Sequence, residues 1–210
     1  MRVSEMFRSL QGEARDAGRP TVFVRLTGCP LRCRWCDSAY AFEGGETWLV
    51  DEIVSRVERF GDDSVCVTGG EPLAQPGVYP LMTRLADLGL DVSLETSGAL
   101  AIDRVDPRVS IVMDLKAPDS GEEARNRWQN LPALRAKDQL KVVVASRADF
   151  DWAVEALFRP EIDADVERWV SPAHGAVSPR ELADWVLDSR RPLRFQWQLH
   201  KALWGDVPGR

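Results

Sequence analysis

Residues 21–40 read TVFVRLTGCPLRCRWCDSAY, and this stretch decides the fold and the place where chemistry is expected. Its first seven residues alternate between two faces and are rich in β-branched side chains, as in a β-strand. Three of the four cysteines in the chain, Cys29, Cys33 and Cys36, follow within eight residues. The stretch therefore predicts a strand that runs directly into a cysteine-rich loop.

Strand and helix patterns alternate along the rest of the chain. Further strands are predicted at 64–68, 91–96, 110–116, 140–146, 167–171 and 194–200, and helices within 47–60, 81–88, 121–136, 148–158 and 178–186. Such alternation indicates βα units and a largely parallel sheet. The 210 residues fall short of the roughly 250 of an eight-fold barrel. We therefore expect an α/β fold, an incomplete and shortened (βα)6-type barrel, in one domain over residues 1–210.

Polar sequences stand directly after most of these strands. They are TGGEP (68–72), ETSG (95–98), DLK (114–116), SPAHG (171–175) and LHK (199–201). The carboxyl ends of parallel strands form the binding face of α/β folds. The polar sequences and the cysteine loop are therefore expected around one mouth.

Charge and hydropathy exclude two classes of partner. The net charge is −6, from 27 basic and 33 acidic residues, and no dense basic cluster is present. Direct binding to nucleic acid is therefore disfavoured. No segment approaches the ~20 apolar residues of a membrane span, and the amino-terminal residues lack the apolar run of a signal peptide. We expect a cytoplasmic protein without membrane contact, whose clustered thiols stay reduced and serve a metal or catalysis.

The cysteine spacing is compatible with two kinds of metal centre, a zinc site or an iron–sulfur cluster. Structural zinc is closed by four ligands, and His174 and His200 lie far along the chain, although they could approach in space. The sharper interpretation is a four-iron, four-sulfur cluster with one iron free of protein ligands. Cys66 could be a fourth ligand, but it stands between two valines in a predicted strand, where a free cysteine commonly serves as a small buried hydrophobe, and we favour this core role.

The spacing Cys29-x3-Cys33-x2-Cys36, with Trp35 before the last cysteine, resembles the signature of radical S-adenosylmethionine enzymes. Thr68-Gly69-Gly70-Glu71-Pro72 resembles the glycine-rich strand of that superfamily. The resemblance implies that S-adenosylmethionine chelates the fourth iron and that one-electron cleavage of its sulfonium yields a radical that abstracts hydrogen from the substrate.

A longer resemblance covers most of the chain. The segments that carry it are 10–13 (LQGE), 17–20 (AGRP), 23–28 (FVRLTG), 95–98 (ETSG), 114–116 (DLK), 140–141 (LK), 171–175 (SPAHG) and 200–201 (HK). Together they resemble the 7-carboxy-7-deazaguanine synthase family. That family converts 6-carboxy-5,6,7,8-tetrahydropterin into 7-carboxy-7-deazaguanine with loss of ammonia, on the route to queuosine. The resemblance implies a 4Fe-4S cluster, S-adenosylmethionine and Mg²⁺ as cofactors, an electron donor such as flavodoxin or ferredoxin, and a homodimer.

The same resemblance assigns site residues. Cys29, Cys33 and Cys36 would bind the cluster, and the Ser38 hydroxyl would bind Mg²⁺, a cation that prefers hard oxygen ligands. The substrate would contact Leu10, Gln11, Gly12, Glu13, Arg25 and Thr68. S-adenosylmethionine would contact Trp35, Asp37, Gly70, Glu71, Glu95, Ser97, Asp114, Leu115, Lys116, Ser171, Pro172, Ala173 and His174.

Residue chemistry alone leaves several of these assignments open. Arg25 lies on an otherwise apolar strand, where its partner is either a substrate carboxylate or an internal carboxylate, that of Glu13 or Asp37. Lys116 and Lys141 could be solvated strand ends. Ala202 stands where the family resemblance leads us to expect an aromatic residue, which weakens any claim that the carboxyl-terminal segment covers the substrate.

Two other functions use the same cysteine loop. A radical activase that installs a glycyl radical on a partner protein would need the loop, but not Arg25 or residues 10–13. A zinc-stabilised binding module would have no catalysis. Iron and sulfide content separates the zinc module from both enzymes, and the identity of the product separates the two enzymes.

Overall fold

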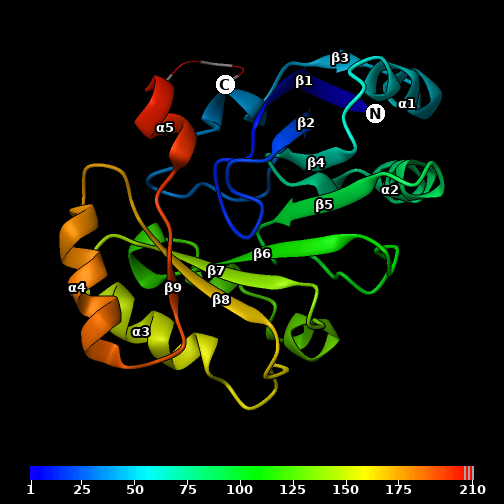
Figure 1. The fold of residues 1–210 in the computed structure, drawn as a ribbon. Coiled ribbons are helices and arrows are strands. Elements are labelled where there is room, and N and C mark those ends of the chain that lie inside the picture. Colours follow the sequence, from blue (N-terminus) through cyan, green and yellow to red (C-terminus); the bar gives the residue numbers. More distant parts are fainter. Residues whose placement is uncertain (206, 208, 210) are drawn as a thin grey trace.

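The computed structural model describes residues 1–205, 207 and 209, and its strands there form one curved sheet (Figure 1). Their order across the sheet is β3-β1-β2-β4-β5-β6-β7-β8-β9. The bounds are β1 Arg2–Leu10, β2 Pro20–Leu26, β3 Glu46–Thr47, β4 Ser64–Gly69, β5 Asp91–Thr96, β6 Ser110–Lys116, β7 Gln139–Val144, β8 Glu167–Pro172 and β9 Arg194–Phe195.

The sheet is largely parallel and does not close. Strands β2 and β4 to β9 run parallel, whereas β1 pairs antiparallel with both β2 and β3. The end strands β3 and β9 are not paired with each other. The predicted α/β fold, an incomplete barrel of largely parallel strands, is confirmed.

Helices α1 to α4 cover the outer side of this sheet, and α5 lies at the mouth (Figure 1). They span α1 Val50–Glu58, α2 Val78–Asp87, α3 Arg147–Leu157, α4 Pro179–Ser189 and α5 Leu199–Trp204. Apolar residues at helical spacing, such as Ile53 and Val57 of α1, face the sheet and are buried. Helix α4 begins with a side-chain cap, because the Ser178 hydroxyl accepts a hydrogen bond from the backbone N–H of Glu181. No helix in the described part of the chain combines the length and apolar character of a membrane span.

Strand β4 lies at the centre of the core. All six of its residues are buried, and Cys66 is fully buried between Val65 and Val67. Burial raises the pKa of the Cys66 thiol well above its ordinary value. Cys66 is therefore a core residue on the strand, as the sequence predicted, and does not belong to the cysteine loop.

Three local predictions were wrong or incomplete. Residues 121–136 form two 3₁₀ turns, η4 Glu123–Arg125 and η5 Trp128–Ala133, in place of a helix, and Pro132 lies inside the second. The predicted strand 194–200 keeps only Arg194–Phe195, and α5 begins at Leu199. The antiparallel strand β1 was not predicted at all.

Candidate active site

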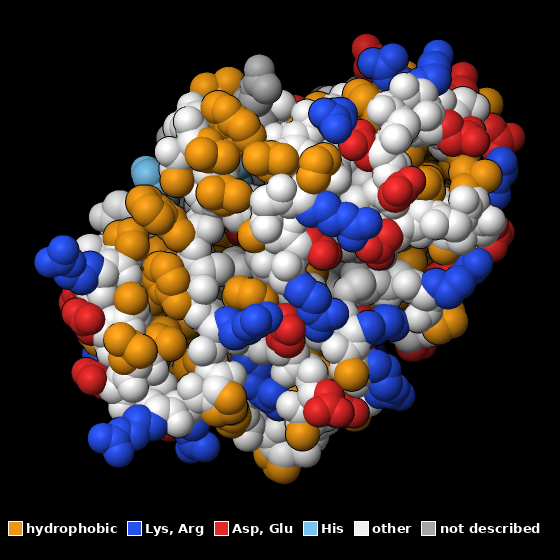
Figure 2. Space-filling view, in the orientation of Figure 1, with side chains coloured by type: hydrophobic (Ala, Val, Ile, Leu, Met, Phe, Trp, Pro, Cys, Tyr) orange, Lys and Arg blue, Asp and Glu red, His pale blue; other side chains and the backbone are white. Residues whose placement is uncertain are grey.

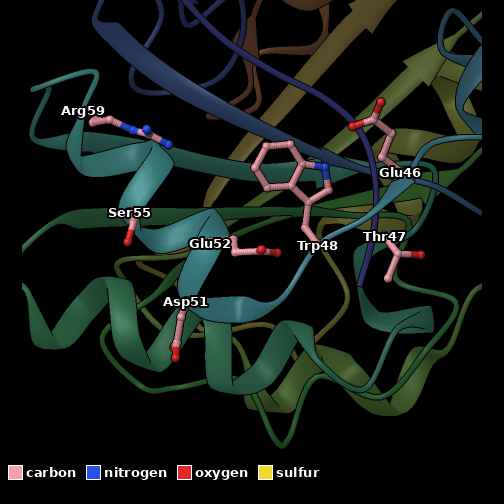
Figure 3. A pocket seen from close by; sticks show the side chains of 7 residues that line it. All are labelled: Glu46, Thr47, Trp48, Asp51, Glu52, Ser55 and Arg59. Carbon is pink, nitrogen blue, oxygen red and sulfur yellow. The ribbon is translucent and has the colours of Figure 1, made fainter.

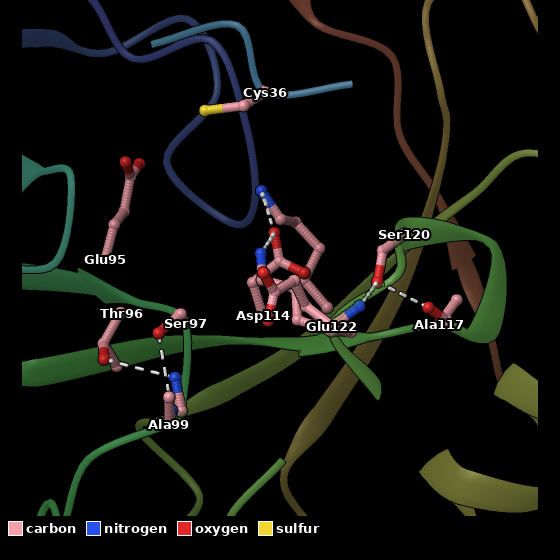
Figure 4. Close-up of polar contacts among 12 residues, drawn as sticks. Cys36, Glu95, Thr96, Ser97, Ala99, Asp114, Ala117, Ser120 and Glu122 are labelled. Atoms are coloured by element: carbon pink, nitrogen blue, oxygen red, sulfur yellow. Dashed lines mark hydrogen bonds and ion pairs between the residues drawn. The ribbon is translucent and has the colours of Figure 1, made fainter. Parts of the chain in front are cut away.

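A cavity of about 410 Å³ opens at the carboxyl ends of the parallel strands and receives most of the predicted site residues. The predicted residues that line it are Leu10, Gln11, Gly12, Glu13, Arg25, Cys29, Cys33, Trp35, Cys36, Asp37, Ser38, Thr68, Gly70, Glu95, Ser97, Asp114, Lys116 and His174. Figure 4 shows Cys36 on the same side of β5 and β6 as the side chains of Glu95 and Asp114. The mouth expected from the sequence is therefore formed.

Five predicted residues do not line this cavity. They are Glu71, Leu115, Ser171, Pro172 and Ala173. Leu115 is buried in the core on β6, and Ser171 and Pro172 are buried at the end of β8. Glu71 and Ala173 are buried as well.

The cysteine loop is attached to the end of β4 by close backbone packing. The backbone N–H of Glu71 donates to the Gly28 carbonyl at 2.7 Å, and that of Gly28 donates to the Ala41 carbonyl at 2.8 Å. A Cβ atom at Gly70 would lie 2.3 Å from the Gly28 oxygen, so only glycine allows this approach. The glycine-rich turn therefore places the loop over the sheet.

All three loop thiols are free and partly exposed to the cavity. Burial raises the pKa of the Cys29 and Cys33 thiols. Within the described residues, no group of three or more His, Cys, Asp or Glu side chains is arranged to hold a single metal ion. Arg32 packs over the Phe42 ring and donates to the carbonyl of Cys29, which orders the loop.

Glu71 joins the ends of two neighbouring strands. Its carboxylate is fully buried and accepts hydrogen bonds from the backbone N–H of Leu73, the Thr96 hydroxyl, and the backbone N–H and hydroxyl of Ser97. Ser97 and Thr96 line the cavity, whereas Glu71 does not. The carboxylate thus has its acceptor capacity used inside the protein, where it holds the ETSG turn against the glycine-rich turn.

We expect Glu71→Ala to destabilise the protein by about 3 kcal/mol or more, because it leaves several buried donors without an acceptor. It should also raise the KM for S-adenosylmethionine about tenfold, because Ser97 loses the carboxylate that holds it at the cavity wall. Denaturant unfolding and steady-state kinetics measure the two effects. Glu71→Gln retains one acceptor oxygen, so its stability and its KM should lie between those of Glu71→Ala and the wild type. An alanine variant with unchanged KM would show that the turn does not depend on Glu71.

A buried ionic network crosses the floor of the cavity. Lys141 on β7 forms an ion pair with Glu13 and lies 3.5 Å from Asp114 Oδ2, which is also 3.4 Å from Lys116 Nζ. Burial opposes the charge on both lysines, but Glu13 and Asp114 raise the pKa values of Lys141 and Lys116. Burial likewise opposes the charge on Glu13, but the Lys141 ammonium lowers its pKa to about 2. The lysines are therefore paired interior cations and not solvated strand ends.

The carboxyl-terminal segment lies across the mouth and contacts the same network. Gln198 donates from Nε2 to Glu13 and to Asp37, both at 2.9 Å, and the Leu199 backbone N–H donates to the Gly12 carbonyl at 3.0 Å. A Cβ atom at Gly12 would lie 2.2 Å from His200 Nδ1. The segment thus covers part of the cavity despite the alanine at position 202. Gln198 was not predicted, since its partners became clear only in the fold.

Arg25 has an internal partner, but neither of the two considered from the sequence. Its Nε donates to Glu5 Oε1 on β1 at 2.7 Å, and the Tyr40 hydroxyl donates to the same oxygen at 2.7 Å. Burial opposes the charge on Arg25, but Tyr40 and the hydrogen-bonded Glu5 carboxylate raise its pKa above the ordinary value. Burial also raises the pKa of Tyr40 to about 12. Glu5 and Tyr40 were not predicted as site residues, because Glu5 lies on the unpredicted strand.

Glu95, expected to contact S-adenosylmethionine, binds two residues that are expected to contact the substrate. Its two oxygens accept hydrogen bonds from the Thr68 hydroxyl at 2.8 Å and from Gln11 Nε2 at 3.2 Å.

The Ser38 hydroxyl caps no backbone N–H of the turn that follows it and lies 3.8 Å from Cys36 Sγ. The hydroxyl oxygen of Ser38 therefore remains available to a cation in the cavity.

A second hollow, of about 500 Å³, lies away from this mouth between β3 and α1 (Figure 3). Trp48 forms its wall, and its rim carries carboxylates such as Glu46 and Asp51. Glu52 in this hollow is engaged with the backbone N–H of Leu49 at the start of α1. None of the predicted site residues contributes to it, so it is not the site of the predicted chemistry.

The family model of the radical SAM superfamily matches residues 23–157. The 7-carboxy-7-deazaguanine synthase of Chlorobaculum tepidum is 45% identical over 207 residues, which cover 97% of this chain and 94% of that protein. The synthase of Koribacter versatilis is 39% identical over 219 residues and 97% of both chains. The chain belongs to the 7-carboxy-7-deazaguanine synthase family.

Solved structures agree with this membership. The crystal structure of QueE from Escherichia coli matches with a TM-score of 0.77 and 25% identity, over 95% of this chain and 94% of that one. SuiB of Streptococcus suis, at 15% identity and a TM-score of 0.58, shares the fold alone. As a member of the synthase family the chain is a radical SAM lyase that uses a 4Fe-4S cluster, S-adenosylmethionine and Mg²⁺. Membership favours this function over the glycyl-radical activase and the zinc module.

The cavity fits the groups that this family uses. Three thiols reach it from one loop, with no fourth cysteine beside them in the described chain. Asp114 Oδ1 is buried and has no hydrogen-bond partner, so an acceptor is left for a hydroxyl or ammonium group. A Cβ atom at Gly70 would lie 2.9 Å from Cys29 Cβ, so the glycine lets the turn pack directly against the first cysteine of the loop.

Proposed function

We propose that the cavity converts 6-carboxy-5,6,7,8-tetrahydropterin into 7-carboxy-7-deazaguanine with loss of ammonia, and that its residues divide between cofactor and substrate. One observation carries the proposal: the three thiols, the Arg25 guanidinium and the carboxylates of Glu13 and Glu95 line one cavity. A cavity of this size encloses a small molecule but not a protein segment, which supports the synthase over the activase. We also infer that the chain folds as a single domain, since its described strands join in one sheet.

Cys29, Cys33 and Cys36 hold the cluster, and the ends of β4 to β6 with the adjacent loops hold S-adenosylmethionine. When bound, these groups supply one-electron cleavage and hydrogen abstraction from the substrate. The predicted cofactor-binding residues on the cavity wall are Trp35, Asp37, Gly70, Glu95, Ser97, Asp114, Lys116 and His174. Asp114 Oδ1 accepts a hydrogen bond from the cofactor, whereas Glu71 supports the turn that contacts it.

The other side of the cavity holds the substrate. Arg25 binds the carboxylate, because a guanidinium donates two parallel hydrogen bonds to a carboxylate. Gln11 and Glu13, with Leu10, Gly12 and Thr68, bind the pterin edge, for which an amide and a carboxylate provide matching acceptors and donors. When Mg²⁺ is bound, Ser38 would supply it with a hard oxygen, the kind of ligand that this cation prefers. The Lys141 ammonium lowers the pKa of Glu13 and so keeps this carboxylate ionised for its contact with the substrate.

Anaerobic turnover tests the proposal. The reconstituted protein, with a chemical reductant, S-adenosylmethionine, Mg²⁺ and carboxytetrahydropterin, should release ammonia and the deazaguanine acid, both detectable by mass spectrometry and an ammonia assay. The same mixture without carboxytetrahydropterin is the control. Absence of product from a protein with an intact cluster would reject the synthase function.

We further infer a homodimer and a reducing, cytoplasmic location, with flavodoxin or ferredoxin as electron donor. Four of the seven large apolar side chains that are exposed in the described chain lie in its carboxyl-terminal part, namely Leu187, Trp197, Leu203 and Val207. Figure 2 shows a band of apolar side chains over α4 and α5, the helices that carry Leu187 and Leu203. A second copy of the chain would remove this band from water.

Light scattering measures the mass of the particle and tests the dimer. We expect a dimer for the wild type and a shift to monomer in Leu187→Arg, because the exposed fraction of Leu187, 74%, places the new charge on the apolar surface and not in the core. Glu181→Arg on the same helix provides a matched exposed substitution away from the band. A wild type that stays monomeric at every concentration would contradict the dimer.

A further inference from the structure

We propose that Glu5 and Tyr40 are positioning residues that fix the Arg25 guanidinium for the substrate carboxylate. The inference rests on the proposed function, in which Arg25 binds that carboxylate. Neither residue belongs to the sequence segments that carry the family resemblance. Both side chains line the cavity beside Arg25.

The hydrogen bond to Glu5 uses one edge of the Arg25 guanidinium and leaves the edge with the two Nη atoms for another ligand. Nε of Arg25 donates to Glu5 Oε1 at 2.7 Å. In the part of the chain that the structure describes, neither Nη atom of Arg25 donates to a protein acceptor. Guanidinium groups bind carboxylates through two parallel N–H bonds. An Arg25 side chain held at Nε therefore presents its two Nη atoms to a carboxylate in the cavity.

The support for Arg25 comes from two different elements. Glu5 and Arg25 are cross-strand partners on β1 and β2, so the sheet itself sets their separation. Tyr40 lies on the 3₁₀ turn η1 Ala39–Phe42, which follows Ser38 in the cysteine loop. Its hydroxyl donates to Glu5 Oε1, and its ring centroid lies 5.8 Å from Arg25 Cζ. The three side chains thus connect the sheet, the cysteine loop and the proposed carboxylate site.

Two physical roles for Glu5 predict opposite effects of substitution. The Arg25 side chain is only 17% exposed, so its guanidinium needs another hydrogen-bond acceptor when Glu5 is removed. The negative charge of Glu95, which already raises the pKa of Arg25, would then attract the guanidinium. A positioning role therefore predicts weaker substrate binding when the acceptor oxygen is removed. A purely electrostatic role predicts the reverse, because the Glu5 charge opposes an anionic ligand.

The test measures equilibrium binding of 6-carboxypterin, and of pterin without the carboxyl group, to the anaerobic holoenzyme by fluorescence. We expect Glu5→Ala to weaken binding of 6-carboxypterin about tenfold or more, the size of one lost hydrogen bond to a charged group. Glu5→Gln should stay within about threefold of wild type, because its amide oxygen still accepts from Nε, and Tyr40→Phe should weaken binding about two- to fivefold. Pterin without the carboxyl group should bind all variants alike.

Steady-state kinetics give an independent readout. In Glu5→Ala the KM for the carboxytetrahydropterin should rise while kcat and the KM for S-adenosylmethionine stay near wild-type values. A structural role alone would disturb all three and would not be rescued by glutamine. Iron content and melting temperature report whether each variant is folded and loaded.

The possible results separate the two proposals. A wild type with no preference for the carboxylated pterin would reject carboxylate binding by Arg25, and with it the proposed substrate site. A wild type with that preference, retained in full by Glu5→Ala, would overturn the positioning role alone. Equal weakening of both pterins, or tighter binding by Glu5→Ala, would overturn it as well.

Discussion

Cys33→Ala will yield a protein without brown colour, without stoichiometric iron and sulfide, and without detectable turnover. Cys33 is one of three thiols that one loop presents to the cavity, and two thiolates do not retain a 4Fe-4S cluster. Visible absorption, iron and sulfide analysis and the ammonia assay, all on anaerobically prepared protein, measure the three losses.

Cys66→Ala is the matched control for this loss. The thiol of Cys66 is fully buried in the middle of β4, so its removal should cost about 1 kcal/mol of stability and leave the cluster in place. A Cys33→Ala protein that keeps its cluster, or a Cys66→Ala protein that loses it, would contradict the assignment of the ligands.

Glu13→Ala should abolish turnover and lower the free energy of unfolding by about 3 to 5 kcal/mol. The substitution leaves the Lys141 ammonium buried with Asp114 as its remaining carboxylate, and removal of one partner from a buried ion pair has a cost of this size. It also removes one of the two acceptors of Gln198, a residue that attaches the carboxyl-terminal segment to the mouth. Denaturant unfolding and turnover measure the two effects.

The double variant Glu13→Gln with Lys141→Met separates stability from activity. Removal of both charges should recover much of the lost stability, because no unpaired ion remains, but it should not restore turnover. Recovery of turnover in the double variant would show that Glu13 serves only as a partner for Lys141.

The pH dependence of stability provides a further check on Glu13. Its pKa falls from an ordinary value of 4.5 to about 2 on folding. Its contribution to stability is therefore complete above about pH 4.5 and is lost as the pH falls toward 2. The difference in unfolding free energy between wild type and Glu13→Gln should shrink over this range. A difference that stays constant from pH 5 to pH 3 would contradict the depressed pKa.

The parallel strands and their loops could be predicted well from the sequence, because most of these strands are runs of apolar residues followed by a short polar segment. Strand β1 was missed for a physical reason. Only Val3 of its residues is buried, and Glu5 and Phe7 border the cavity, so the strand lacks the continuous apolar face that marks a buried strand. The partner of Arg25 was missed with it.

The carboxyl-terminal segment shows the same limit. Phe195, Trp197 and Leu199 alternate with polar residues and resemble a strand, but Gln196 and Gln198 bind Glu13 in the cavity and only Arg194–Phe195 pair with the sheet. In the same way, Asn126 and Asn130 bind backbone groups of β6 and of the turn after β5, which replaces the expected helix by 3₁₀ turns. Tertiary hydrogen bonds of this kind leave no periodic pattern in a sequence.

The electron paramagnetic resonance spectrum of the reduced cluster, recorded before and after addition of S-adenosylmethionine, tests the central claim most directly. A cluster held by Cys29, Cys33 and Cys36 alone has an iron to which S-adenosylmethionine binds, so the g-values should change on addition. The same addition to Asp114→Ala should need a higher concentration of S-adenosylmethionine, because the free acceptor at Oδ1 is lost. A spectrum that does not respond to S-adenosylmethionine, or a protein that contains no iron, would contradict the account.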